Sequence, residues 1–516
     1  MHSKIFRRSI FRRSVLLLLF SQLACSPIEK ATGQTGMKIA ETVIMPSAAT
    51  FSGWWGNAIN MANSASGAVF TDRTDGSQWI CFAEDNGLST AAPNLSVAHV
   101  VNGIVTVSHK TLPVFSTTDQ HNACSIALDN SGFIHLTYDQ HATALHYFKS
   151  LHPRDMFSWS GPLSMLGGTI ETQVTFVLLF TNPVSGELYC SFQNPGGAGG
   201  QQFLYHYNTS TGWEAAAGTA SLGRLANYVP GGAGATFVSG LPQWDKTTGN
   251  LWFAYNVSEA SVPNWNCGGD PGSPCGWYLL GWNGTSFIKW DGTAQSLPLT
   301  LSNSSPWFTV NAGAAPCFSV LDSVSIDANG TLFVPYIDCD ASNFLQVYVL
   351  SCPHQATCTR HQLTANNSLF SPPGPAGWLG ISTWACSSAP YSCGEYVQSP
   401  LSVSSGTCTW ITYPDIFNWG SGQIAFKSCD NFQTSSSSYI TTRFNPNGGT
   451  YPDQVANYTR GTISFLFTYA NDTQFRFSTM VSSSTTDVGK IWLMTMDPGS
   501  VAASGGVTLS GGMTMQ

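Results

Sequence analysis

A duplicated tripeptide is the part of this sequence best suited to chemistry. Asp-Gln-His occurs at residues 119–121 and again at residues 139–141. Between the two copies, the turn residues 129–132 (Asp-Asn-Ser-Gly) separate two apolar, β-rich runs, a pattern that predicts a β-hairpin. With the hairpin centred between residues 130 and 131, position 121 is expected opposite position 140. His121 and His141 are therefore expected within a residue of each other, at the end of the hairpin away from the turn.

Two imidazoles and two carboxylates at one end of a hairpin form a candidate site for proton transfer or metal binding. A neutral imidazole of His121 or His141 can accept a proton near neutral pH. Asp119 and Asp139 are expected to orient the two rings. A pair of hydrogen-bonded histidines with only a structural role is the simpler interpretation, which the duplication of the motif disfavours.

Other side chains are candidates to complete this site. Tyr138 and Tyr147 are candidate acids, with packing inside a sheet as the alternative for each. Asn122, Asp119, Asp139 and Arg73 are candidate substrate contacts. Arg73, or alternatively Lys149 or Arg224, could pair with a substrate carboxylate, because a cationic side chain binds a carboxylate well. His135 lies within an apolar run and is interpreted as an interior histidine rather than a catalytic one.

The same histidines and carboxylates would also suit zinc. The neighbouring asparagine and glutamine residues offer hydrogen-bond partners instead, and no Asp-x-Asp-x-Asp-Gly calcium loop is present. We therefore expect no cofactor, with a structural zinc or calcium ion as the alternative.

The composition is that of an all-β protein. The chain of 516 residues has 50 glycines and 27 prolines, and only 9% of its residues are charged. Turn residues punctuate short apolar runs throughout, and no long segment has a helical period. Seven times, a polar turn ending at or near a glycine precedes an aromatic- or aliphatic-rich run, at spacings of 54 to 92 residues. These glycines are Gly76, Gly132, Gly186, Gly249, Gly330, Gly422 and Gly489.

Seven hairpin units with room for two further strands each predict a seven-bladed β-propeller. A β-helix would have shorter and more uniform repeats, and a β-sandwich rarely needs so many similar hairpins. We assign residues 51–500 to the propeller and residues 25–50 to a linker or first strand. Residues 501–516 form a Gly/Ser-rich tail.

Residues 1–24 are interpreted as an export signal peptide, because a basic segment precedes a short apolar run. Cys25 follows directly, so a lipid anchor at Cys25 is an alternative to free secretion. The protein is expected to be secreted or held on the cell surface or outer membrane as a lipoprotein. Removing residues 1–24 takes away five of the 20 basic residues and none of the 28 acidic ones. A chain this acidic is not expected to bind nucleic acid.

The sequence contains 14 cysteines, which in an exported protein are expected to form disulfides. Three pairs are close enough in sequence to be candidates: Cys267 with Cys275, Cys352 with Cys358, and Cys386 with Cys393.

The run from Asp119 to Ser150 resembles the BNR-repeat-containing propeller family, which includes ulvan lyases. The resemblance rests mainly on the hairpin motif and on the segment Leu145–Ser150 (Leu-His-Tyr-Phe-Lys-Ser). Weaker support comes from residues 297–300 and 324–330, and the resemblance extends from about Trp54 to about Ser351. It implies a seven-bladed propeller that acts on a polysaccharide. It also implies that His121 and His141 line the active site.

The sequence departs from the family at two positions. The tyrosine that acts as base and acid in those lyases corresponds to Phe176 here, which can neither accept nor donate a proton. The assisting arginine corresponds to Gln193, which is a candidate substrate contact. The family's mechanism therefore cannot be transferred unchanged.

Two functions follow as alternatives. The first is an exported lyase that cleaves a uronate-containing extracellular polysaccharide by β-elimination, with His121 or His141 as base. The second is a glycan-binding propeller without catalysis, for which loop tryptophans such as Trp54, Trp55, Trp265, Trp277 and Trp307 could form a platform. A sialidase-like hydrolase is disfavoured because arginines are scarce.

Overall fold

The structure is a computed structural model, and the elements below fall within the unit Gly36–Gln516. It describes residues 38–45, 69–84, 94–114, 124–182, 184–194, 201–227, 234–238, 242–245, 247–259, 277–300, 303, 320–321, 325–326, 330–339, 345–354, 356–362, 401–403, 407–414, 423–428, 437–441, 462–467, 475–481 and 490–497.

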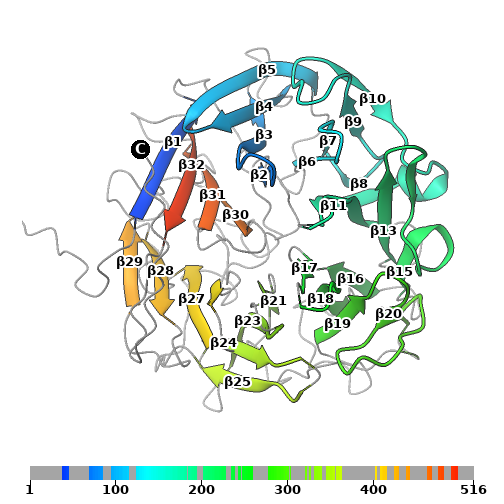
Figure 1. Cartoon of the computed structure of the whole chain (residues 1–516), viewed down its shortest axis with the longest axis vertical. Coiled ribbons are helices and arrows are strands. Elements are labelled where there is room, and N and C mark those ends of the chain that lie inside the picture. The colour runs from blue at the N-terminus through cyan, green and yellow to red at the C-terminus, as the bar shows by residue number, and fades with distance from the viewer. Residues whose placement is uncertain are drawn as a thin grey trace, which may run out of the picture. The chain divides into compact units, whose positions relative to one another are not determined.

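The described residues form antiparallel strands in seven sheets of four to six strands (Figure 1). The first sheet contains β2 (Val69–Thr71), β3 (Gln78–Glu84), β4 (Asn94–Val101) and β5 (Ile104–Val114). The second contains β6 (Cys124–Leu128), β7 (Ile134–Tyr138), β9 (Tyr147–Ser150) and β10 (Trp159–Leu163). The third contains β8 (His141–Thr143), β11 (Val174–Thr181), β12 (Leu188–Asn194), β13 (Gln201–Asn208), β14 (Gly212–Ala215) and β15 (Arg224–Asn227).

The fourth sheet contains β16 (Gly234–Val238), β17 (Gln243–Trp244), β18 (Leu251–Glu259), β19 (Trp277–Trp282) and β20 (Phe287–Ile288). The fifth contains β21 (Val320–Leu321), β22 (Ser325–Ile326), β23 (Leu332–Cys339), β24 (Leu345–Cys352) and β25 (Thr359–Gln362). The sixth contains β26 (Leu401–Val403), β27 (Thr407–Pro414), β28 (Gln423–Ser428) and β29 (Ser437–Thr441). Short 3-10 turns, η2 (Thr169–Thr172) and η3 (Ser221–Gly223), are the helical elements of the described part.

The last sheet joins strands from the two ends of the described chain. It contains β30 (Thr462–Phe467), β31 (Phe475–Val481), β32 (Lys490–Asp497) and β1 (Lys38–Met45). β1 pairs antiparallel with β32 from Lys38 opposite Asp497 onward (Figure 1). The N-terminal strand thereby covers an edge that β32 would otherwise leave unpaired. The all-β class predicted from the composition is confirmed.

The hairpin turns predicted from glycine positions recur in the described sheets. Gly76, Gly132, Gly186, Gly249 and Gly330 all have positive φ angles between 72° and 81°, a region that glycine adopts without steric cost. Gly422 and Gly489 lie outside the described residues. In three of these turns, the glycine N–H donates to the carbonyl of the residue four positions earlier at 2.7–2.8 Å, namely Asp72, Asn182 and Asp245.

Replacing Gly186 with alanine is expected to destabilise the protein more than replacing Gly249. Both glycines have similar φ values of 74° and 76°, so both substitutions carry the left-handed backbone cost of about 1–2 kcal/mol. A Cβ at Gly186 would meet the Asn130 and Arg73 side chains, whereas nothing lies within 4 Å at Gly249. These exposed side chains can move away, but doing so breaks the hydrogen bond between Arg73 and Asn130, which adds about 0.5–1.5 kcal/mol at residue 186. Urea unfolding of the two variants measures the difference, and equal losses would contradict this packing of the turns.

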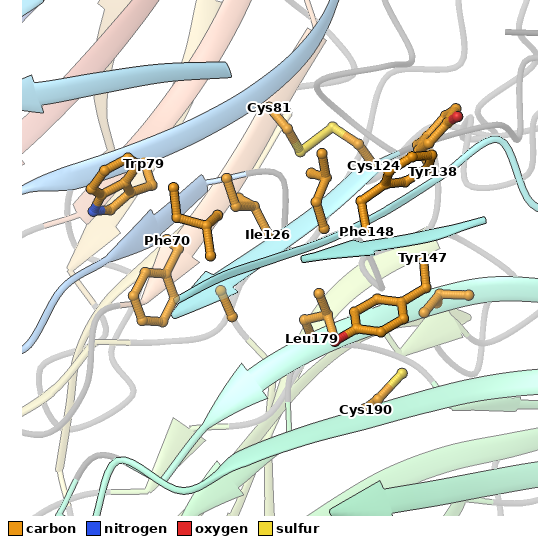
Figure 2. Packing of buried hydrophobic residues seen from close by; sticks show 14 of the residues in the cluster. Phe70, Trp79, Cys81, Cys124, Ile126, Tyr138, Tyr147, Phe148, Leu179 and Cys190 are labelled. Atoms are coloured by element: carbon orange, nitrogen blue, oxygen red, sulfur yellow. A yellow bond between two sulfur atoms is a disulfide. The ribbon is translucent and has the colours of Figure 1, made fainter. Parts of the chain in front are cut away.

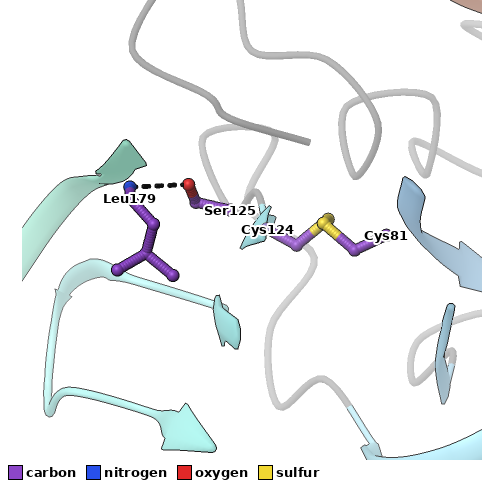
Figure 3. Close-up of a disulfide and its surroundings, with 4 residues drawn as sticks. All are labelled: Cys81, Cys124, Ser125 and Leu179. Carbon is purple, nitrogen blue, oxygen red and sulfur yellow. Dashed lines mark hydrogen bonds between the residues drawn. A yellow bond between two sulfur atoms is a disulfide. The ribbon is translucent and has the colours of Figure 1, made fainter. Parts of the chain in front are cut away.

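The first three sheets are joined at buried positions. A disulfide links Cys81 in β3 to Cys124 in β6, and the Ser125 hydroxyl accepts a 2.8 Å hydrogen bond from the Leu179 backbone N–H in β11 (Figure 3). Around these links lies a continuous apolar core that includes Trp79, Ile126 and Phe148 (Figure 2). The second sheet, which carries the predicted hairpin, is therefore fixed on both sides.

The disulfide between Cys352 and Cys358 was predicted from sequence and is confirmed. The candidate pairs Cys267–Cys275 and Cys386–Cys393 lie outside the described residues, as does Cys25. The Cys81–Cys124 disulfide was not predicted. In the described part of the chain, no helix has the length and apolar character needed to cross a membrane.

Candidate functional site

The predicted hairpin is formed by β6 and β7. Cys124 pairs with Tyr138 and Leu128 with Ile134, so the hairpin is centred on Ser131, half a residue later than predicted. His141 lies beyond the end of β7 that is away from the turn. The structure does not describe residues 119, 121 and 122, so the predicted proximity of His121 to His141 stays a prediction.

The chain leaves the hairpin directly after Tyr138. Asp139 and Gln140 carry it from the second sheet into the third, where β8 begins at His141 and pairs with β11. In that pairing, Thr175 lies opposite His141. His141 therefore belongs to the neighbouring sheet rather than to an extension of its own hairpin.

The backbone on both sides of His141 is strained. Asp139 has a φ of 57° and Ala142 a φ of 56°. The left-handed region costs a residue with a Cβ about 1–2 kcal/mol, less for aspartate than for alanine. Such conformations persist where the surrounding structure enforces them, and they concentrate at functional sites.

Three side chains hold this segment in place. The Ala142 N–H donates to Thr175 Oγ1 at 2.7 Å, and the Thr143 hydroxyl donates to the Asp139 carbonyl at 2.9 Å. The Gln140 side-chain amide donates to the His146 carbonyl at 2.9 Å. Asp139, Gln140 and Thr175 are all buried. The backbone around His141 is consequently held by β11 of the third sheet and by the connection that leads from β7 to β9.

Gln193 lies in the same row of the third sheet as His141. Across the strands, His141 pairs with Thr175, Thr175 with Gln193, and Gln193 with Gln202. Strands in a sheet lie about 4.8 Å apart, so the backbones of His141 and Gln193 are about 10 Å apart. Thr175, Gln193 and Gln202 are buried polar residues, and the Gln202 amide donates to Ser191 Oγ at 2.8 Å. The structure thus brings Gln193, predicted as a substrate contact, near His141.

Arg73 lies in a different place. Its guanidinium donates to the Val184 carbonyl at 2.9 Å, and to Asn130 Oδ1 and the Ser185 carbonyl at 3.1 Å each. These acceptors are in hairpin turns, at the opposite end of β6, β7, β11 and β12 from His141. The structure therefore does not bring Arg73 together with His141.

Tyr147 belongs to a buried hydrogen-bond chain with His135 and Asp129. His135 Nε2 lies 3.2 Å from Asp129 Oδ2, and its Nδ1 lies 2.8 Å from the Tyr147 hydroxyl. An ionised carboxylate only accepts hydrogen bonds, so Nε2 carries the proton and Tyr147 donates to Nδ1. Tyr207 and Trp213 of the third sheet pack against His135. His135 is fully buried, as the interior interpretation predicted.

The protonation states of these hydrogen-bonded side chains follow from their environment. Burial lowers the pKa of His135 below its ordinary 6.5, so the ring is neutral. Burial acts to raise the pKa of Asp129, but the hydrogen bond from His135, the Phe133 N–H and the nearby Lys149 together hold that pKa below 3.8. Lys149 Nζ lies 3.9 Å from Asp129 Oδ2. The hydrogen-bonded group therefore consists of a neutral histidine between a phenol and a carboxylate, and it is buried between the second and third sheets.

Acidification is expected to destabilise the protein through His135. Below pH 6.5 the unfolded histidine binds a proton that the buried one excludes, so the unfolded state binds more protons and stability falls as the pH falls. The slope reaches about 1.4 kcal/mol per pH unit for one such group. Urea midpoints of wild type and a His135→Gln variant, compared at about pH 7.5 and 5.5, measure this term. The variant should show a shallower dependence than wild type. Equal slopes in the two proteins would contradict this role of His135.

Tyr138 is buried on the other face of β7. Its ring packs near that of Phe148 (Figure 2). The His146 ring is also near, and both centroids lie 5.4 Å from that of Tyr138. Burial, with the Asp139 carboxylate second, raises the pKa of Tyr138 above its ordinary 10. Burial likewise raises the pKa of Tyr147. Both phenols stay protonated near neutral pH, which excludes them as bases without a further change in their surroundings.

Within the described residues, no group of three or more histidine, cysteine, aspartate or glutamate side chains could hold a metal ion. His121 and Asp119 lie outside that part, so the zinc and calcium alternatives stay predictions.

Residues 78–233 match the family model described as a BNR repeat-containing family member. The resemblance stated from the sequence is confirmed over this region, which contains the His141 segment. Curated protein sequences give no significant match.

Solved structures of polysaccharide lyases share the fold. The crystal structure of polysaccharide lyase Uly1 superimposes with a TM-score of 0.54 at 11% identity, covering 90% of this chain and 100% of that one. An ulvan lyase of family PL25 superimposes with a TM-score of 0.51 at 12% identity, covering 86% and 94% of the two chains. At these identities the similarity concerns the fold.

Two features of the site were missed by reasoning from sequence. One is Thr175. The sequence gives no indication of its role, because that role depends on the pairing of β11 with β8, which lie far apart in sequence. The other is the left-handed backbone at Asp139 and Ala142. Aspartate tolerates that region better than most residues, but alanine gave no indication of it.

Proposed function

We propose that this protein is an exported, seven-bladed propeller that cleaves a uronate-containing polysaccharide by β-elimination. Its site is centred on His141 and His121. The observation that carries the proposal is the strained backbone around His141. Strain enforced on both sides of a histidine, within the family-matched region, is expected where a side chain must be presented for chemistry.

The propeller architecture is supported by the seven sheets of the described residues. Pairing of β1 with β32 is the arrangement that a closed ring of sheets requires. The Cys81–Cys124 disulfide supports export, because disulfides persist in oxidising compartments. Residues 1–24 supply the export signal in this proposal.

The reaction needs a base that removes the proton α to the uronate carboxylate. It also needs a donor for the leaving oxygen and a group that stabilises the carboxylate charge. Tyrosines cannot supply the base here, because Phe176 stands at the family position and burial keeps Tyr138 and Tyr147 protonated. A histidine is neutral near physiological pH and can accept the proton. We assign this role to His141, with His121 as its partner.

The other roles are assigned to Tyr138, which ends β7 shortly before His141, and to Gln193, which lies in the same row of the third sheet as His141. Tyr138, which stays protonated, is assigned as donor to the leaving oxygen. Gln193 is assigned to the substrate carboxylate through its amide N–H groups, in place of the family's arginine. Tyr147 is not used, because its proton is already donated to His135.

The polymer class is proposed from the neighbours. One of the PL25 ulvan lyase structures, with a TM-score of 0.50 and 12% identity, is described as bound to -[GlcA(1-4)Rha3S]-. A glucuronate-containing polymer is therefore the first substrate to test. An acidic protein would repel a densely sulfated chain unless basic residues gather at the site, so weakly sulfated polymers are included.

A glycan-binding propeller without catalysis is the second candidate. It is favoured by Phe176 and Gln193, which remove the family's tyrosine and arginine. Trp277 begins β19, and the other tryptophans expected to form a sugar platform lie outside the described residues.

Elimination creates an unsaturated uronate with a characteristic ultraviolet absorbance, which gives a direct assay. The mature protein is incubated with a panel of uronate polysaccharides, and absorbance and chain length are followed. New absorbance with shortened chains supports the lyase. Binding on a glycan array without absorbance on any polymer supports the binding protein instead.

A further inference from the structure

We propose that Thr175 is the positioning residue for His141, and that its hydroxyl acts by holding the backbone of Ala142 in the left-handed conformation. This inference rests on the proposed function, because it assigns Thr175 a role at the same site. The juxtaposition that carries it is the register pair of Thr175 with His141, together with the hydrogen bond from the next residue in β8.

The Ala142 N–H needs an acceptor because its position lies where β8 meets β11 irregularly. The register shifts between the pairs Val174–Thr143 and Thr175–His141, so Ala142 stands between them without a regular partner. Thr175 Oγ1 accepts the N–H at 2.7 Å and replaces the missing ladder bond. Thr175 is 2% exposed, so water does not readily compete for this hydrogen bond.

The contact acts on the geometry of the site more than on the stability of the fold. Ala142 is exposed, so the loss of one hydrogen bond at this residue should leave the fold intact. Without the threonine oxygen, strand β8 loses the hydrogen bond that keeps Ala142 in the left-handed conformation. His141 is the residue directly before Ala142, so its backbone is free to move. A shift of about 1 Å in a reacting group can lower a rate about a hundredfold.

Thr137 offers a matched control. It is a buried threonine in the preceding strand β7, 0% exposed, and its Oγ1 has no hydrogen-bond partner among the described residues. Replacing either threonine with valine removes one hydroxyl and keeps the shape. Only Thr175→Val removes an acceptor from the backbone beside His141.

The experiment compares Thr175→Val, Thr175→Ser and Thr137→Val with wild type. Thr175→Val is expected to lower kcat about tenfold or more, with KM changed less than about twofold, because positioning acts in the transition state. Thr175→Ser keeps the hydroxyl and should retain kcat within about twofold. Thr137→Val should behave as wild type. Equal activity of Thr175→Val and Thr137→Val would overturn the inference.

A second readout does not need catalysis. In protein labelled with ¹³C-histidine, the His141 ring signals should shift or broaden in Thr175→Val and stay unchanged in Thr137→Val. Unchanged His141 signals in Thr175→Val would overturn the inference even in an active enzyme. If wild type cleaves no uronate polymer, the proposed function fails, and these ring signals alone decide whether Thr175 positions His141.

A third variant tests the route through Ala142. Glycine adopts the left-handed region without steric cost, so it needs the threonine acceptor less. The double variant Ala142→Gly, Thr175→Val should therefore lie closer to wild type in its His141 ring signals than Thr175→Val alone. If the double variant departs from wild type as far as Thr175→Val does, the hydroxyl does not act through the backbone of residue 142.

Discussion

Replacing His141 with alanine is expected to lower the rate of β-elimination by at least about a hundredfold, the usual contribution of a general base. Burial keeps Tyr138 protonated, and Tyr147 donates its hydrogen bond to His135, so neither phenol can replace the imidazole. His141→Ala removes a side chain from a segment held mainly by backbone and neighbouring contacts, and the fold should therefore persist. The measurement is kcat on the polymer that wild type cleaves, with circular dichroism to verify folding.

His152→Ala is the matched control for that substitution. His152 is exposed, and in the described contacts its backbone carbonyl accepts a 2.8 Å hydrogen bond from the Ser150 hydroxyl, which alanine preserves. This variant should keep wild-type activity. His121→Ala should resemble His141→Ala if both rings serve one site. Full activity in a folded His141→Ala protein would end the assignment of this residue as base.

Local features of the fold could be predicted from the sequence because their causes are local. Gly76, Gly132 and Gly186 mark hairpin turns since positive φ favours glycine whatever the rest of the chain does. The β6–β7 hairpin followed from its own turn residues, and Cys352 pairs with Cys358 across a separation of only six residues. The error of half a residue in the hairpin centre arose because turn composition alone does not fix which residues pair first.

Features that join different sheets could not be predicted in this way. His141 pairs with Thr175, and a connection of more than thirty residues separates them in sequence. Which of two nearby strands β8 would join depends on how the sheets pack, and a pattern of single-strand periodicity contains no such information. The same reason hid the commitment of Tyr147 to His135, since a tyrosine in an apolar strand fits both a buried network and an open site.

Arg73 shows most clearly what residue type alone does not predict. A guanidinium in a carbohydrate-active protein is a reasonable carboxylate contact by its chemistry. Its position is decided by two turns of other sheets, whose three acceptors it engages at 2.9–3.1 Å. Residue type therefore predicted what Arg73 can bind, while the packing of the turns decided what it does bind.

Replacing both Cys81 and Cys124 with alanine is expected to lower the free energy of unfolding by about 4 kcal/mol. The two cysteines are 43 residues apart, and a cross-link restricts the unfolded chain more as the loop it closes becomes longer. The disulfide also joins β3 to β6, so its removal loosens the second sheet, from whose strand β7 the chain passes to His141. Both effects act in the same direction. Urea unfolding under oxidising conditions measures the loss.

The double variant Cys352→Ala, Cys358→Ala is the matched control, because it removes a disulfide that closes a loop across six residues. The loop-length relation gives it about 2 kcal/mol. Cys352 is buried, as are Cys81 and Cys124, so both double variants lose buried sulfur. Which double variant loses more free energy of unfolding is therefore set by the length of the closed loop and by the strands that the disulfide joins. A smaller loss for Cys81 and Cys124 than for the short-loop pair would show that the first and second sheets hold together without their covalent link.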